Sequence, residues 1–105
     1  MKTKVIFRKW PKGEVIALFP ATAGTMDPFT CQSYQNVGQH GAASVHLVHD
    51  TLPATPSEFR PLARELRRIG YRLQIVRRFT RHDLESRKKQ IAQFAAGIET
   101  PAAVG

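Results

Sequence analysis

Residues 55–70 carry the strongest local secondary-structure signal in this chain, and they predict one amphipathic helix. Thr55 suits a helix cap, Pro56 suits the first helical position, and Glu58 stands where a capping box needs its acid. Apolar residues then recur three and four apart on one helix face: Phe59, Leu62, Ala63, Leu66 and Ile69. Gly70 follows in the position of a left-handed C-terminal cap. The pattern therefore predicts a helix from about Pro56 to Ile69.

Apolar runs on both sides of this helix predict strands. Residues 5–7 are apolar throughout and residues 14–19 nearly so, which is typical of strands covered on both faces. The Pro-Lys-Gly sequence at residues 11–13 favours a hairpin between them. Residues 29–37 contain enough Thr, Tyr and Val to indicate a third strand. Residues 71–79 begin with alternating apolar and polar side chains and predict a fourth.

The order of these elements predicts an α+β fold with a single domain over residues 1–79. One helix packs on one face of a mostly antiparallel four-stranded sheet (β-β-β-α-β), and 105 residues suit one such domain. Residues 42–50 fit a short strand or a helical turn and stay unassigned. Residues 80–105 are expected to form a peripheral basic tail, helical or disordered. We therefore expect the chain to remain folded when it is truncated after Arg81.

The positive charge of the chain is concentrated in one region. Sixteen Lys and Arg face eight Asp and Glu, a formal net charge of +8. Residues 60–89 alone supply the whole of this excess, whereas residues 20–57 contain no Lys or Arg. Such asymmetry indicates a charged surface that faces a partner. The candidate contacts to nucleic acid or another anion are Arg60, Arg64, Arg67, Arg68, Arg72 and Arg78.

A second candidate site is the Gln39–His40 pair, which lies between Gly38 and Gly41. Flanking glycines allow backbone amides to face an anion or a partner. The alternative is a tight turn that Gln39 and His40 hold together by hydrogen bonds. Both interpretations stay open at this point.

The chain offers no motif that predicts catalysis, a metal or a cofactor. Neither Cys31 nor a serine stands in the glycine-flanked context of a catalytic nucleophile. Cys31, His40, His46 and His49 lack the paired spacing of structural zinc ligands. We therefore expect a binding protein rather than an enzyme, with no catalytic residue, no metal and no cofactor.

Two classes of partner remain. The first is an acidic protein or a second copy of the chain, docked at a sheet edge and guided by the basic face. The second is DNA or RNA, whose phosphates would bind the arginine-rich helix and the tail. No apolar run approaches the length of a spanning helix, so no membrane is expected. A single cysteine suits the reducing cytoplasm, and binding of a protein partner is the preferred function.

Four sequence blocks carry a resemblance to a known family. They are KVIFRK at residues 4–9, EVIALFP at 14–20, YQNVGQHG at 34–41 and GYRLQIV at 70–76. Together with the helix between them, they resemble a family of small uncharacterised bacterial and phage-borne proteins, and the likeness covers residues 4–79. The resemblance implies a small α+β domain in a bacterial, mobile-element setting. It brings no activity and no catalytic residue.

Overall fold

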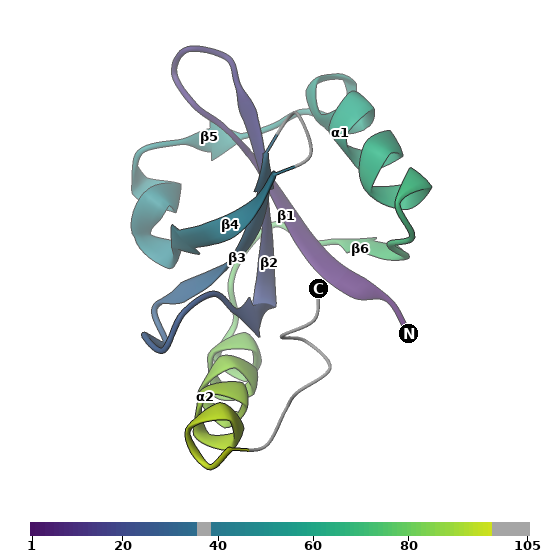
Figure 1. Ribbon diagram of the computed structural model, residues 1–105. Coiled ribbons are helices and arrows are strands. Elements are labelled where there is room, and N and C mark those ends of the chain that lie inside the picture. Colours follow the sequence, from purple (N-terminus) through teal and green to yellow (C-terminus); the bar gives the residue numbers. More distant parts are fainter. Residues whose placement is uncertain (36–38, 98–105) are drawn as a thin grey trace.

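Strands β1 (Thr3–Lys9) and β2 (Val15–Ala23) form an antiparallel hairpin at the centre of the sheet (Figure 1). The structure, a computed structural model, describes residues 1–35 and 39–97. In the turn that joins the two strands, Gly13 adopts a φ of 100°, which glycine tolerates far better than other residues. The hairpin predicted from the two apolar runs is confirmed.

Further strands extend this hairpin on both sides. β3 (Thr30–Gln35) pairs antiparallel with β2, and β4 (Gln39–Ser44) pairs antiparallel with β3, so that β4 forms one edge of the sheet. Two short strands share the other side of β1. β5 (Leu52–Pro53) lies antiparallel to its C-terminal half, and β6 (Leu73–Ile75) lies parallel to its N-terminal half. The sheet is mostly antiparallel, as predicted.

The predicted count of four strands was wrong, because the described residues form six. β4 and β5 escape the sequence pattern because their side chains are largely exposed, and such strands need no apolar alternation. The third predicted strand, at residues 29–37, is β3, and its last two residues lie outside the described residues. The fourth predicted strand, at residues 71–79, is shorter in the structure and comprises only β6. Beyond β6, Val76 and Phe79 pack on the face of the sheet that carries Ile6 and Leu18.

Helix α1 (Pro56–Arg68) covers one face of the sheet. Its start is fixed as predicted, because a carboxylate oxygen of Glu58 accepts a hydrogen bond from the Thr55 backbone N–H (2.9 Å). Beyond its end, Gly70 adopts a φ of 117°. The apolar stripe of α1 packs on buried residues of three strands: Val5, Phe7, Ala17, Phe19 and Tyr34. The predicted helix is confirmed to within one residue of its C-terminal end.

The opposite face of the sheet is also covered. A short 3₁₀ helix, η1 (Val45–His49), and the segment after β6 pack against it. These two elements enclose an apolar cluster of Ile6, Ile16, Leu18, Cys31 and Leu47. Because β1 and β2 contribute side chains to both faces, their apolar runs are nearly continuous, as predicted. Residues 42–50, unassigned from the sequence, hold the end of β4 and all of η1.

Helix α2 (Arg81–Ala95) forms within the segment that was expected to be a peripheral tail, and it packs beside the end of β2 (Figure 1). The expectation of a peripheral position was wrong for this helix, because the side chains of Asp83 and Arg87 are 0% and 2% exposed. α2 is anchored largely by polar contacts, so a search for an apolar stripe misses it. Residues 98–105 of the expected tail lie outside the described residues.

Candidate functional site

The arginines of α1 lie on the surface, but they differ in their partners. Arg60, Arg64 and Arg67 are exposed, and none of them has a carboxylate within 4.0 Å in the part of the chain that the structure describes. Arg68 is different, because its guanidinium lies 3.2 Å from a carboxylate oxygen of Glu65. Of the four candidate arginines on α1, three are therefore exposed without a carboxylate partner among the described residues, and the fourth is paired within the helix.

The other two predicted arginines do not extend one continuous surface. Arg72 follows α1, and its side chain is exposed while its backbone carbonyl accepts a hydrogen bond from Thr3 (2.6 Å). Arg78 is also exposed, but it lies between Val76 and Phe79, which pack on the face opposite α1. The sheet thus separates Arg78 from the arginines of the helix.

Gln39 and His40 lie in strand β4 rather than in a turn, and both side chains are exposed. The Nε2 atom of His40 lies 2.7 Å from the Tyr71 hydroxyl, and the Tyr34 ring meets the His40 ring edge-on. Burial and a hydrogen bond to Glu65 raise the pKa of Tyr34, and burial raises that of Tyr71. Both phenols therefore stay protonated at neutral pH. The hydrogen bond from the Tyr34 hydroxyl to Glu65 joins β3 to α1, and the contact between His40 and Tyr71 joins β4 to the segment after α1.

The outer edge of β4 is open along the strand. Its six residues pair with β3 on one side, and within the described residues no strand pairs with the other side. All but one of its side chains are exposed, and none is Lys, Arg, Asp, Glu or Pro. The strand therefore lacks the charged or proline residues that commonly protect an edge from pairing.

An apolar cleft lies between the β2–β3 loop and α2, and none of its described lining residues belongs to β4. It has a volume of about 410 Å³, and its apolar walls include Met26 from the β2–β3 loop and Ile91 and Phe94 from α2. Met26 and Phe94 are more than half exposed. A Cβ atom placed on Gly24, which also lines the cleft, would lie only 3.0 Å from the Cβ of Ala42 in β4. The β2–β3 loop therefore lies next to the Ala42 side chain of β4, and we call the free edge of β4 together with this loop the edge surface.

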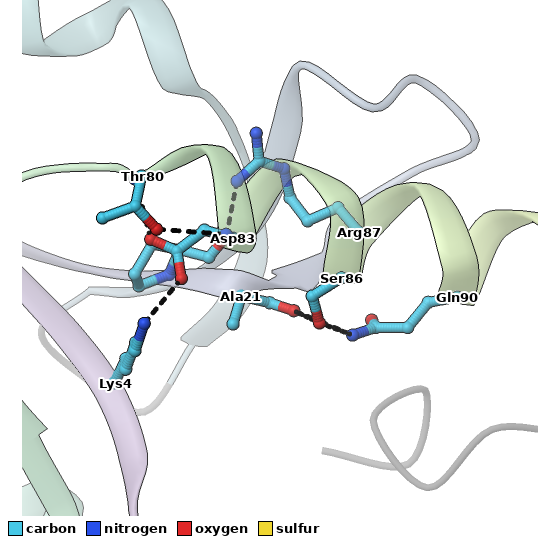
Figure 2. A network of polar contacts seen from close by, with 8 residues as sticks. Lys4, Ala21, Thr80, Asp83, Ser86, Arg87 and Gln90 are labelled. Atoms are coloured by element: carbon cyan, nitrogen blue, oxygen red, sulfur yellow. Dashed lines mark hydrogen bonds and ion pairs between the residues drawn. The ribbon is translucent and has the colours of Figure 1, made fainter.

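The N-terminal turn of α2 is held by a buried carboxylate (Figure 2). Asp83 accepts hydrogen bonds from the Lys4 ammonium (3.0 Å) and from the Thr80 backbone N–H (2.9 Å). Burial alone would raise the pKa of Asp83, but the bonds from Lys4 and Thr80 outweigh it and hold that pKa below its usual value. Asp83 thus attaches α2 to β1 as an ionised group.

Arg87 attaches the same helix to β2 and to the β2–β3 loop. Its guanidinium donates to the backbone carbonyls of Pro28 (2.8 Å) and Pro20, and it lies over the Phe79 ring at 5.5 Å from the ring centroid. The one arginine of α2 that is buried therefore serves the fold. It is not free to meet a partner.

Gln90 replaces a missing strand beside β2. The pairing of β1 with β2 ends at Ile6 and Leu18, so β2 continues to Ala23 without β1 beside it. There the Gln90 amide donates to the Ala21 carbonyl (2.8 Å) and accepts from the Ala23 N–H (2.8 Å). In a parallel sheet, one residue donates to a carbonyl and accepts from an N–H that are two residues apart on the neighbouring strand. The Gln90 side chain makes the same pair of hydrogen bonds to Ala21 and Ala23. The side chain thus satisfies backbone groups that a strand would otherwise satisfy.

The roles of Asp83, Arg87 and Gln90 in attaching α2 were not predicted from the sequence, although one local pattern pointed to the start of the helix. Thr80 and Asp83 have the spacing of a capping box, and the Thr80 hydroxyl accepts from the Asp83 N–H at 3.1 Å. That spacing predicts a helix start at residue 81. Nothing in the local sequence distinguishes Arg87 from its exposed neighbours Lys88 and Lys89, because the distinction depends on distant carbonyls.

The residues weighed as nucleophile or metal ligands do not come together. Burial raises the pKa of Cys31 to about 11, so its thiol remains protonated and weakly nucleophilic. Among the described residues, no three side chains of His, Cys, Asp or Glu are grouped so that they could hold a metal ion. Neither of the two α-helices, as far as the structure describes them, has the length and apolar character needed to cross a membrane.

No protein-family model, no curated protein and no solved structure matched the chain. The resemblance to small bacterial and phage-borne proteins therefore stays a prediction. The case for a function depends on the surfaces described above.

Proposed function

We propose that this protein is a binding module that associates with a second copy of itself through the free edge of β4. The observation that carries the proposal is the six-residue, uncharged and exposed edge strand. Two such edges can pair antiparallel about a two-fold axis and so continue the sheet across the dimer. Each copy would then satisfy backbone groups that are open to solvent in the monomer.

The distribution of charge supports a second copy as the occupant. A chain with a net charge of +8 repels its own copies wherever cations meet. Residues 20–57 contain no Lys or Arg, and this segment includes all of β4 and the β2–β3 loop. Two copies can therefore meet at the edge surface with their arginines directed elsewhere, whereas a polyanion gains little from contact there.

The apolar cleft next to the β2–β3 loop adds a second source of affinity. Met26 and Phe94 are 52% and 59% exposed, which is unusual for large apolar side chains that lie together at one cleft. Burial of these side chains on association would favour a protein partner through the hydrophobic effect. Strand pairing would set the register of the contact, and the apolar side chains would strengthen it.

Charge placed on the edge tests the proposal. A Cβ atom on Gly41 would meet only the Ser33 hydroxyl, at 3.6 Å, so a side chain fits there. Gly41→Lys and Gly41→Glu each bring two like charges together across the dimer axis, and we expect each variant to sediment as a monomer. Leu52→Lys is the matched control, because Leu52 is 63% exposed on β5, at the other side of the sheet.

Mixing the two charge variants makes the test specific. An equimolar mixture of Gly41→Lys and Gly41→Glu should recover the dimer mass, because opposite charges then face each other at the axis. Thermal melts of both variants verify that each chain is folded. Wild-type mass for folded Gly41→Lys, or the same dissociation in Leu52→Lys, would contradict docking at β4.

A second function, the binding of DNA or RNA, is favoured by one observation. Arg60, Arg64 and Arg67 are exposed on α1 without a carboxylate partner among the described residues. Cations that displace counterions from phosphates make binding weaken as the salt concentration rises. Arg68 contributes less to such a surface, because Glu65 already neutralises it.

The salt dependence of a gel shift tests this second function. The double change of Arg60 and Arg64 to Gln should reduce the log–log salt slope by roughly 1.5, the contribution of two phosphate contacts. The double change of Arg77 and Arg78 to Gln is the control, because it removes the same charge from the opposite side of the sheet. A folded wild-type protein that shifts neither DNA nor RNA at low salt would rule this function out.

A further inference from the structure

A polar cleft opens where the two central strands separate. β1 turns aside to pair with β6, while β2 continues beneath α2, and the space between them has a volume of about 580 Å³. Cavities of this size accommodate small organic ligands. Figure 2 shows one wall of the cleft, where Lys4, Asp83 and Ser86 lie.

Amide side chains line this cleft from three different elements. Gln32 comes from β3, Gln74 from β6 and Gln93 from α2. An amide offers a donor and an acceptor side by side, which matches the paired donor and acceptor on the edge of a nucleobase. Tyr71 adds a half-buried ring, and stacking on Phe19 at 5.1 Å between centroids holds that ring in place.

The ionisable groups of the cleft favour an anion. Lys2, which precedes β1, and His82 of α2 are both exposed and line the cleft. Among the described lining residues, Asp83 is the only acid, and Lys4 pairs with its carboxylate at 3.0 Å. A bound phosphate would therefore meet uncompensated positive charge and no free carboxylate.

We propose that this cleft binds a nucleotide unit. Lys2 and His82 hold the phosphate, and the amides with Tyr71 hold the base. Most of the residues that line the cleft carry an amide, a hydroxyl or a charged group, and these groups offer hydrogen bonds to a ligand with polar atoms. The unit is either a free nucleoside monophosphate or one residue of a single strand. The proposal does not depend on self-association, because the cleft contains no residue of β4.

Titration of the full chain with the four nucleoside 5′-monophosphates, followed by amide NMR, tests the proposal. We expect at least one of them, or a short single-stranded oligonucleotide, to shift signals of Gln32, Gln74 and Tyr71. Lys2→Gln should weaken that binding about tenfold, as the loss of one charge-assisted hydrogen bond does. Arg81→Gln is the matched control, because Arg81 is exposed beside His82 but does not line the cleft.

The remaining arms of the titration separate the outcomes. Binding of the oligonucleotide alone, with the same dependence on Lys2, supports the site and identifies a strand as its source. Equal affinity for inorganic phosphate overturns the proposal, because the base then contributes nothing. Equal affinity for the unphosphorylated nucleoside overturns it as well, and so does an absence of cleft shifts with every probe. Folded Gly41→Lys protein should bind as wild type does, which distinguishes this proposal from docking at β4.

Discussion

Helices α1 and α2 have similar compositions but attach to the sheet by different physical means. α1 packs through apolar side chains such as Leu62 and Leu66, and its arginines remain outside. α2 packs beside β2 through polar groups, and its buried arginine donates to backbone carbonyls. A basic residue in the sequence is therefore not by itself a sign of a binding surface. The two helices show that the same residue type is exposed on the surface in one place and holds the fold together in another.

Removal of α2 should have the largest effect. Truncation after Arg81 was expected from the sequence to leave a folded domain, and the structure leads us to expect the reverse. Lys4 would lose its carboxylate, and Ala21 and Ala23 would lose the amide that bonds their backbone groups. We expect the truncated chain to lose its cooperative thermal transition in circular dichroism. A transition as sharp and as high as that of the full chain would show that α2 is dispensable.

Arg87→Met should destabilise the protein by about 3–5 kcal/mol, because two carbonyls each lose a hydrogen bond from a charged donor. Lys88→Met is the control on the next residue, which is exposed, and it should change stability by no more than about 0.5 kcal/mol. Urea unfolding of the two variants measures both values. Similar losses in the two would mean that α2 does not depend on its buried arginine.

Leu66→Ala should test the apolar attachment of α1. Leu66 is fully buried, and its truncation should cost about 2–5 kcal/mol through lost transfer free energy and a cavity. Arg64→Ala, on the exposed side of the same helix, should be close to neutral. Chemical denaturation of both variants checks the contrast, and a greater loss in Arg64→Ala would reverse our assignment of the helix faces.

The loss of stability at acid pH should depend on the ionised Asp83 that attaches α2 to β1. The pKa of Asp83 is lowered in the folded state, so its contribution is complete above the unfolded value of about 3.9 and is lost as the pH falls below it. Asp83→Asn should therefore lower stability at neutral pH and flatten the loss below about pH 4.

Part of the loss of stability at acid pH should remain in that variant. The hydrogen bond from Lys9 lowers the pKa of Glu58 to about 2, which adds a loss of its own in the same range of pH. Asp50→Asn, at an exposed aspartate after η1, is the control. Stability curves of equal acid slope for wild type and Asp83→Asn would contradict the role of Asp83.

The sequence predicts those parts of the fold whose signals are local. Residues 55–70 predict α1 because the cap, the apolar stripe and the terminal glycine stand within one helix, and the hairpin follows from two apolar runs and a turn. β4 leaves no pattern, because none of its side chains is fully buried. The burial of Arg87 cannot be predicted locally either, because it depends on Pro20 and Pro28, about sixty residues away in the chain.

The candidate surfaces also differ in whether local sequence predicts them. Exposure of Arg60, Arg64 and Arg67 follows from the helix period and was predictable from the sequence. The edge surface and the polar cleft arise where distant elements meet. The β2–β3 loop approaches β4 at the first, and the start of β1 approaches α2 at the second. Tertiary contacts of this kind have no signature in a single sequence.

Sedimentation velocity of the nuclease-treated wild-type protein, at low and at high salt, tests self-association through β4 most directly. The edge surface lies within residues 20–57, which contain no Lys or Arg, so the contact is not held by charge. We predict a dimer mass at both salt concentrations, because strand pairing and apolar burial are little weakened by salt. A monomer at every accessible concentration, or an assembly that dissociates in salt or after nuclease treatment, would contradict it.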